Sequence, residues 1–328
     1  MSATGPANSP ANSPADGVHL GLDIGGTKVL GVAVDAAGGV LAEVRLASEP
    51  GPERVVAVAA EAARSLAGAL GAPLDALAGI GVGVPGVVDA RRGVLSHAVN
   101  LGVDGEGLAL ADRLRERTGL PVAVENDVNA AAVGAARVLG LDGTDLAYLS
   151  IGTGLAAGLV LGGRLHRGTR GGAGEIGHLP VDPLGPVCPC GQRGCLEALV
   201  SGSAIARAWP VEPEALAPGE GPSHALFRAA AAGDEKAGQV RDRVADHLAA
   251  AVQLLVLTVD VDVVVLGGGV AEVGERLRLA VASALSRRAR ASAFLASLDL
   301  PARVTTVPQG RPVAAVGAAL LAPGREAR

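Results

Sequence analysis

All three cysteines of the chain lie in one short segment that follows a histidine. The residues are His178, Cys188, Cys190 and Cys195, which gives the spacing His-x9-Cys-x-Cys-x4-Cys. Three thiolates and one imidazole complete the tetrahedral shell of Zn²⁺ and leave no open position, as in structural rather than hydrolytic zinc sites. Clustered cysteines in an odd number also fit a reducing cytoplasm better than a disulfide framework. Three unrelated reduced thiols are the alternative.

Carboxylates near this segment and near an expected strand end suit recognition of a hydroxylated ligand. Asn126 and Asp127 follow the expected strand 122–125, and Glu175 and Glu197 lie close to the two ends of the cysteine segment. A carboxylate at a strand end can accept a proton from a substrate hydroxyl, so Asp127 is a candidate general base. Ionised carboxylates also accept hydrogen bonds from hydroxyls. The alternatives are a helix N-cap at Asn126-Asp127 and two solvated glutamates.

Three glycine-rich turns follow expected strands and could bring backbone amides close to phosphate oxygens. They are Asp23-Ile24-Gly25-Gly26-Thr27-Lys28, Gly152-Thr153-Gly154 and Gly267-Gly268-Gly269. Glycine lets the backbone approach a ligand closely and aims N–H groups at an anion. In the first turn, Asp23 could also hold a hydrated Mg²⁺ through water. Each turn alone could be a plain hairpin, but three in this order favour a nucleotide site without the Walker spacing.

Runs of apolar residues between these motifs predict the elements that would position them. In the first half we expect strands at 18–23, 28–34, 40–46, 78–84 and 121–125 and helices at 53–70, 112–118 and 126–139. In the second half we expect strands at 146–151, 155–161, 164–166 and 263–266 and helices at 223–232, 235–258 and 313–321. A strand–glycine turn–strand hairpin occurs in both halves, which predicts a duplication of two α/β lobes. Residues 168–202, rich in glycine and proline, are expected to form a loop.

Composition excludes several functional classes. The 328 residues carry 28 Lys+Arg against 33 Asp+Glu, a balance unlike the basic face of a nucleic-acid binder. Aromatic residues make up 1% of the chain, too few for a stacking platform, and Trp209, Phe227 and Phe294 are expected in the core. No apolar run reaches the roughly 20 residues of a membrane span. Residues 1–17 lack the features of a signal peptide and are expected to form a disordered tail, so the protein is expected to be cytoplasmic.

Seven motifs occur together in an order typical of one family. They are DIGGTK at 23–28, GVGVPG at 81–86, ENDVNAAA at 125–132, IGTGLAAG at 151–158, GEIGH at 174–178, CPCGQRGCLE at 188–197 and VVLGGGV at 264–270. On these motifs the chain resembles the ROK family of bacterial sugar kinases and related repressors, in the actin-like ATPase superfamily. The resemblance spans residues 18 to about 320, and the cysteine segment together with GEIGH is its most specific part.

The resemblance implies an α/β fold of two actin-like, ribonuclease H-like lobes, with mixed sheets flanked by helices and a cleft between them. A small lobe is expected at 18–122, completed by the C-terminal helix 313–322, and a large lobe at 123–312 with a zinc loop at 174–197. ATP and a sugar would meet in the cleft, where the γ-phosphoryl group passes to a sugar hydroxyl, typically the 6-hydroxyl of a hexose. A homodimer or homotetramer is the family expectation.

The resemblance also implies roles for individual residues, with Asp127 as the catalytic base. The residues expected to bind the sugar are Asn100, Asn126, Asp127, Glu175, His178 and Glu197. Those expected to bind ATP with Mg²⁺ are Asp23, Gly25, Gly26, Thr27, Lys28, Gly152, Thr153, Gly154, Gly268 and Gly269. His178 would bind a structural Zn²⁺, with Cys188, Cys190 and Cys195, through one ring nitrogen and the sugar through the other.

Several alternatives stay open at this point. Glucose is the expected acceptor, while N-acetylglucosamine, N-acetylmannosamine, mannose and fructose are alternatives. Polyphosphate could replace ATP, because the glycine turns contact phosphates and not the base. A transcriptional regulator of the same family would carry a winged-helix domain ahead of the first turn, and 22 residues precede Asp23. A catalytically silent sugar-binding protein would not require a base at Asp127.

Overall fold

The computed structural model describes residues 17–324 except 106, 213, 215, 218 and 219, so the expected disordered tail, apart from Gly17, lies outside the described residues. The described chain forms two compact units. One contains residues 17–127 and 315–324, and the other contains residues 128–314. Among the described helices, none combines the length and apolar character needed to cross a bilayer.

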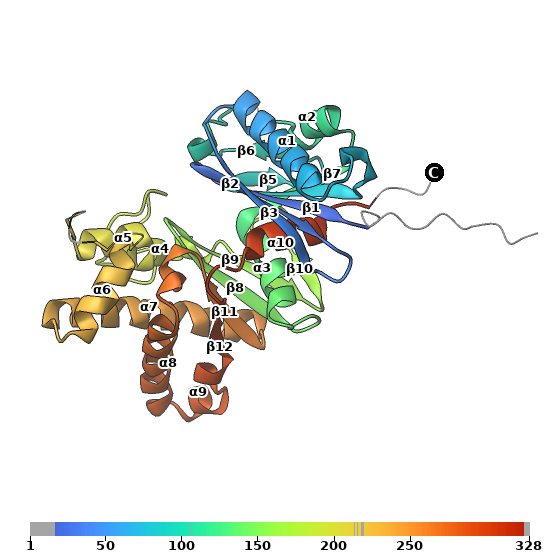
Figure 1. The fold of residues 1–328 in the computed structure, drawn as a ribbon. Coiled ribbons are helices and arrows are strands. Elements are labelled where there is room, and N and C mark those ends of the chain that lie inside the picture. Colours follow the sequence, from blue (N-terminus) through green and yellow to red (C-terminus); the bar gives the residue numbers. More distant parts are fainter. Residues whose placement is uncertain (1–16, 106, 213, 215, 218–219, 325–328) are drawn as a thin grey trace, which may run out of the picture. The chain divides into compact units, whose positions relative to one another are not determined.

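The first unit is an α/β unit built on one five-stranded sheet, and its elements are shown in Figure 1. The strands of this sheet are β1 (His19–Ile24), β2 (Lys28–Val34), β3 (Val40–Ala47), β4 (Gly79–Val84) and β7 (Val122–Asn126). A separate two-stranded sheet contains β5 (Val87–Asp89) and β6 (Val94–Ser96). Its helices are α1 (Pro52–Ala69), α2 (Leu110–Thr118) and most of α10 (Val313–Leu321). α1 and α2 pack against each other beside the sheet (Figure 1).

The second unit is also an α/β unit with a five-stranded sheet, and it contains more helices. Its strands are β8 (Leu146–Ile151), β9 (Leu155–Leu161), β10 (Arg164–His166), β11 (Val263–Gly267) and β12 (Val304–Thr306). Its helices are α3 (Asp127–Val138), α4 (Leu196–Val200), α5 (Gly202–Ala208), α6 (Pro222–Ala231), α7 (Glu235–Val259), α8 (Glu275–Arg290) and α9 (Ala293–Ser297). The buried faces of α7 and α8 form the main core of this unit with β8, β9 and β11.

The two five-stranded sheets have the same topology. Their strand orders are β3-β2-β1-β4-β7 and β10-β9-β8-β11-β12. In each sheet the first three strands in chain order form an antiparallel meander, and the next two add in parallel. The predicted duplication of an α/β lobe is therefore confirmed. The carboxyl ends of the parallel strands, where ligands bind in such sheets, carry the Asn126-Asp127 and Gly267–Gly269 motifs.

Two glycines of the first sheet allow α10 to lie directly on it. A Cβ atom added to Gly21 of β1 would lie 1.9 Å from the backbone oxygen of Ala315, and one added to Gly81 of β4 would lie 1.7 Å from that of Ala318. Neither oxygen belongs to a side chain that could turn away. Gly81, the first glycine of GVGVPG, therefore has a packing role in addition to any role in the motif.

We expect Gly81→Ala to lower the free energy of unfolding by about 3 kcal/mol or more, because α10 must move away from the sheet to admit the methyl group. Urea unfolding monitored by circular dichroism measures this loss. Gly68→Ala is the matched control: no atom lies within 4 Å of the added Cβ atom. Within helix α1 this change should stabilise by about 0.5–1 kcal/mol. Equal stability of Gly81→Ala and the wild type would contradict the close approach.

Three expectations from the sequence are corrected by the structure. The expected loop 168–202 contains α4, because Leu196, Ala198 and Val200 are buried. The expected lobe boundary after residue 122 falls inside β7, which pairs in parallel with β4, so the first unit extends to residue 127. Phe294 was expected in the core but is 62% exposed, because α9 has no fully buried face.

Candidate functional site

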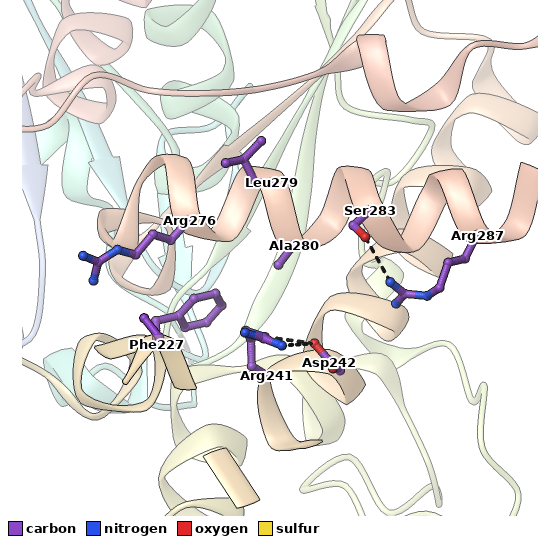
Figure 2. Close-up of a pocket in the computed structure, with 9 residues that line it drawn as sticks. Phe227, Arg241, Asp242, Arg276, Leu279, Ala280, Ser283 and Arg287 are labelled. Carbon is purple, nitrogen blue, oxygen red and sulfur yellow. Dashed lines mark hydrogen bonds and ion pairs between the residues drawn. The ribbon is translucent and has the colours of Figure 1, made fainter. Parts of the chain in front are cut away.

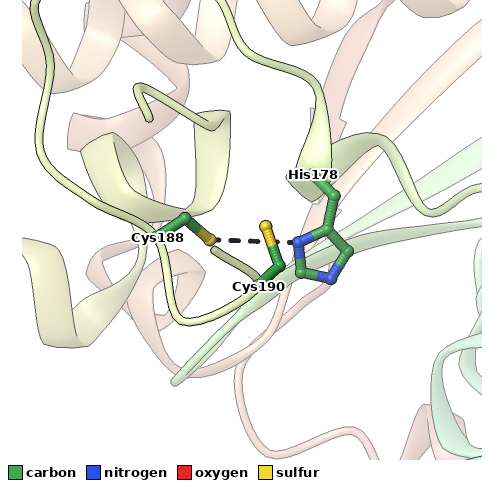
Figure 3. A group of neighbouring side chains, drawn as sticks. All are labelled: His178, Cys188 and Cys190. Carbon is green, nitrogen blue, oxygen red and sulfur yellow. Dashed lines mark hydrogen bonds between the residues drawn. The ribbon is translucent and has the colours of Figure 1, made fainter. Parts of the chain in front are cut away.

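The four predicted metal ligands come together in the second unit. Cys188 Sγ lies 4.0 Å from His178 Nδ1, and the Sγ atoms of Cys190 and Cys195 are 3.7 Å apart. One donor atom from each of His178, Cys188 and Cys190 lies within 4.8 Å of the others. Figure 3 shows one ring nitrogen of His178 turned toward the two cysteine sulfurs and the other turned away. The imidazole can therefore serve a metal through Nδ1 and keep Nε2 for another partner.

The donor set fits a structural zinc ion. Sulfur atoms bound to one tetrahedral Zn²⁺ at about 2.3 Å are about 3.8 Å apart, close to the spacing of Cys190 and Cys195. Hydrogen bonds from Gln192 lower the pKa of Cys190 to about 6, whereas burial raises the pKa of Cys195 to about 12. A bound cation deprotonates a coordinating thiol outright, so zinc would remove the cost of ionising Cys195. His178, Cys188, Cys190 and Cys195 would hold the ion.

The GEIGH motif places Glu175 and His178 by lying against strand β9. A Cβ atom added to Gly174 would lie 1.7 Å from the backbone oxygen of Ala157, and one added to Gly177 would lie 1.9 Å from that of Leu155. Ala157 also donates its N–H to the Gly174 carbonyl at 2.8 Å. The two glycines thus let the backbone cross β9 closely on both sides of Glu175. The side chain of Glu175 is exposed, as a ligand-binding group would be.

In the first unit, the glycine turn 25–28 lies beside the segment that carries Asn100. A Cβ atom added to Gly26 would lie 3.1 Å from the backbone oxygen of Asn100. At the end of β7, Asn126 donates from its side-chain amide to the carbonyl of Gly86 at 3.4 Å. Asn100 therefore lies next to Gly26 of the DIGGTK motif, and Asn126 lies next to Gly86 of the GVGVPG motif. Gly86 was not among the predicted site residues, although its positive φ of 112° marks it as special.

The carboxyl of Asp23 is partly buried and feels the negative charge of Asp127. Burial and the negative charge of Asp127 raise the pKa of Asp23 to about 6, and the nearby charge of Lys28 partly opposes this shift. Asp23 is the residue expected to hold Mg²⁺ through water. Two carboxylates with unfavourable mutual repulsion form a site that a divalent cation would stabilise, because the added positive charge favours both ionised forms.

The raised pKa of Asp23 predicts a pH dependence of stability. The carboxyl binds its proton more tightly in the folded state, so the free energy of unfolding falls as the pH rises from about 4 to about 6. The full difference is about 3 kcal/mol at neutral pH, from the shift between 3.8 and about 6. Asp23→Asn should therefore be the more stable protein at pH 7.5 in urea unfolding without Mg²⁺. The advantage should disappear near pH 4.

The exposed carboxylate of Asp104, which lies in the same unit, provides the control for this prediction. Asp104→Asn should unfold like the wild type at both pH values. An Asp23→Asn variant whose stability relative to the wild type does not change between pH 4 and 7.5 would refute the assignment.

The second glycine turn, between β8 and β9, contacts the carboxylate expected to bind sugar. Glu197 lies in the first turn of α4, and its Oε2 accepts the N–H of Leu155 at 3.1 Å. A Cβ atom added to Gly154 would lie 2.6 Å from the same oxygen. The third turn lies nearby, since a Cβ atom added to Gly268 would lie 2.7 Å from the backbone nitrogen of Ile151 at the end of β8. Close approach of the backbone therefore requires glycine at position 268, whereas the neighbour of Gly154 is a side-chain oxygen and no atom of the described residues lies within 4 Å of a Cβ atom added to Gly152 or Gly269.

The predicted site residues fall into two groups, one in each unit. The first unit holds Asp23, Gly25, Gly26, Thr27, Lys28, Asn100, Asn126 and Asp127. The second unit holds Gly152, Thr153, Gly154, Glu175, His178, Cys188, Cys190, Cys195, Glu197, Gly268 and Gly269. Sequence reasoning missed the segment Ser201–Ser203, which hydrogen-bonds to the turn 152–154. The signal that could have revealed it is a serine N-cap before a helix.

A cavity of about 340 Å³ lies among α6, α7 and α8, apart from these groups (Figure 2). Arg241, Arg276 and Arg287 line it. Two of the three guanidinium groups already have partners: Arg241 pairs with Asp242 and Arg287 with Asp246, each at 2.8 Å. None of the predicted site residues lines the cavity.

Known proteins resemble this chain over most of its length. A glucokinase from Thermotoga maritima is 35% identical over 271 residues, which are 79% of this chain and 84% of that protein. An N-acetylmannosamine kinase from Escherichia coli is 37% identical over 255 residues, 76% of this chain and 82% of that protein. The crystal structure of a ROK family glucokinase from Streptomyces griseus, in complex with glucose and AMPPNP, has a TM-score of 0.75 at 32% identity. It covers 93% of this chain and 99% of that chain.

A match that includes both units shows which family the chain belongs to. The ROK family matches residues 19–325 of the sequence, from the first strand of the first unit past the last helix. The solved ROK structure above covers 93% of the chain with a similar fold. The fold expected from the motifs, two α/β units of the actin-like type, is therefore confirmed, and the chain belongs to the ROK family.

Proposed function

We propose that this protein transfers the γ-phosphoryl group of ATP to the 6-hydroxyl of a hexose, with glucose as the substrate. The observation that carries the proposal is the position of Asp127. It begins α3 directly after the carboxyl end of β7, and its charge reaches the neighbouring carboxyl of Asp23. A base and a cation ligand side by side are what phosphoryl transfer to a hydroxyl requires. Relatives that bear the names glucokinase and N-acetylmannosamine kinase support a sugar as acceptor.

In the proposed reaction Asp127 accepts the proton of the attacking hydroxyl as the oxygen bonds to the γ-phosphorus. The bond from that phosphorus to the bridging oxygen breaks, and ADP leaves with the electron pair. Mg²⁺, when bound near Asp23, neutralises phosphate charge. The chain positions the reactants, which is the main source of catalysis in phosphoryl transfer.

Hydrogen-bonding side chains would orient the sugar so that one hydroxyl reaches Asp127. These are the amides of Asn100 and Asn126, the carboxylates of Glu175 and Glu197, and Nε2 of His178. One oxygen of Glu197 already accepts the N–H of Leu155, which leaves the other for a sugar hydroxyl. Each carboxylate oxygen has lone pairs for hydroxyl donors, and this set favours a polyhydroxylated ligand.

A kinase of N-acetylmannosamine is the second candidate. The Escherichia coli relative of that name is 37% identical to this chain, slightly more than the glucokinase from Thermotoga maritima at 35%. Identity at this level does not separate the two acceptors. The side chains that contact position 2 of the sugar would have to discriminate a hydroxyl from an acetamido group.

Release of ADP from Mg-ATP across a panel of sugars tests the proposal. The panel contains glucose, mannose, fructose, N-acetylglucosamine and N-acetylmannosamine, with polyphosphate as a second donor. We expect turnover with glucose and formation of glucose 6-phosphate, detected with a specific dehydrogenase. Preferred turnover of N-acetylmannosamine would show that this sugar, and not glucose, is the acceptor. The proposed reaction class would be unchanged. Absence of turnover with every sugar and both donors, in protein that still binds sugar in a thermal-shift assay, would contradict kinase activity.

A further inference from the structure

The turn between β8 and β9 is held from one side by the segment that joins α4 to α5. The N–H of Gly202 donates to the Gly152 carbonyl at 2.7 Å, and the hydroxyl of Ser203 donates to the Thr153 carbonyl at 3.1 Å. Two successive carbonyl groups of the turn are therefore fixed in direction. The chain from β8 to α5 brings these residues together across about 50 positions of sequence.

A second serine fixes the hydroxyl of Ser203. The Oγ atoms of Ser201 and Ser203 are 2.9 Å apart, and Ser201 Oγ also accepts the N–H of Ala204 at 3.2 Å as the N-cap of α5. Because the hydroxyl proton of Ser203 is donated to Thr153, the proton between the two serines belongs to Ser201. The hydrogen bonds thus run in one direction, from Ser201 to Ser203 to the turn.

Fixing these carbonyls also fixes the amides on the opposite side. A trans peptide is planar, and its N–H points away from its C=O. The Gly152 carbonyl shares a peptide with the N–H of Thr153, and the Thr153 carbonyl shares one with the N–H of Gly154. Within the described residues, neither N–H makes a hydrogen bond, whereas the next amide, that of Leu155, is taken by Glu197. Two free donors therefore point away from α5.

We propose that Ser203, supported by Ser201 and Gly202, is a positioning residue that aims the amides of Thr153 and Gly154 at the phosphate oxygens of ATP. This inference rests on the proposed function, because it takes the turn 152–154 to be a phosphate site. Gly202 permits the arrangement, since a Cβ atom there would lie 3.2 Å from the Gly152 oxygen. Free backbone donors held in one direction form an anion site without a charged side chain.

Binding of ADP and of adenosine, measured by calorimetry on the full chain, tests the proposal. Ser203→Ala should weaken ADP binding roughly five- to tenfold, the effect of losing one net hydrogen bond, and leave adenosine binding unchanged. The kcat/KM for ATP should fall by the same factor, while the KM for sugar stays constant. Ser203→Thr should restore both values, because the side chain is exposed and the methyl group has room.

Ser297→Ala is the matched control, since its exposed hydroxyl also donates to a backbone carbonyl, that of Phe294 at 2.7 Å. It should bind ADP like the wild type. Equal ADP affinity in Ser203→Ala and the wild type would overturn the inference. An equal loss of affinity for ADP and for adenosine would also overturn it, because it would indicate a merely structural role. If the wild type binds ADP and Ser203→Ala responds as expected, but no sugar is phosphorylated, the proposed function fails and the positioning role stands.

Discussion

Asp127→Asn should lower kcat, measured with the sugar that the wild type phosphorylates, by about 10²–10⁴-fold. This is the usual range for removal of a general base. The amide keeps the size of the side chain and cannot accept the proton of the attacking hydroxyl. Sugar affinity should change little, because an amide still hydrogen-bonds to hydroxyl groups. Steady-state release of ADP gives kcat, and calorimetric titration gives the affinity for the sugar.

The same variant has a second effect that does not depend on turnover. The charge of Asp127 is one cause of the raised pKa of Asp23, so its removal should lower that pKa from about 6 toward the usual value. Consequently, the loss of stability with rising pH should be smaller in Asp127→Asn than in the wild type. Asp104→Asn serves again as the control, with unchanged kcat and pH dependence. If Asp127→Asn kept full activity, another group would have to be the base.

Removing zinc should lower kcat/KM by about 10–100-fold, because ligand geometry in such sites depends on the metal. The four proposed ligands lie between Glu175 and Glu197, and Cys195 precedes Glu197 by two residues. Glu197 in turn accepts the N–H of Leu155 at the glycine turn. Loss of the metal would therefore release both the carboxylates proposed to bind the sugar and a contact of the expected phosphate site.

The experiment begins with the zinc content of the purified protein, measured by elemental mass spectrometry, and we expect one ion per chain. Dialysis against a chelator, followed by excess Mg²⁺, separates loss of zinc from loss of the Mg²⁺ that ATP requires. Activity should return when Zn²⁺ is added. Cys190→Ser should reproduce the loss without a chelator. Full activity in protein verified to be free of zinc would rule out the structural role of the metal.

The local elements could be predicted from the sequence where apolar periodicity and turn residues agree. The hairpin strands Lys28–Val34, Leu146–Ile151, Leu155–Leu161 and Arg164–His166 have the predicted bounds. Asp35 shows why: its Oδ1 accepts the N–H groups of Ala37 and Gly39, so the turn is stabilised by its own residues. The close approach of His178 to the cysteines also follows from spacing, because the four residues belong to one short segment.

What could not be predicted depends on contacts between residues far apart in the sequence. α4 has five residues and is stabilised by burial of its apolar side chains, which no local pattern reveals. The exposure of Phe294 reflects the surface position of α9 and not the character of the residue. The contact of Ser203 with Thr153 joins two segments whose meeting is set by the fold of the whole unit. Local chemistry identified candidates, whereas the fold decides which of them meet.

The position of α10 has a consequence for how the protein is made. The sheet of the first unit is complete once residue 126 is synthesised, yet the helix that covers Gly21 and Gly81 lies at the opposite end of the chain. A ribosome adding about 5–20 residues per second reaches α10 roughly 10–40 s later. During that interval Gly21 and Gly81 lack the helix that packs on them in the folded chain. A chain cut short before residue 313 would never gain this contact.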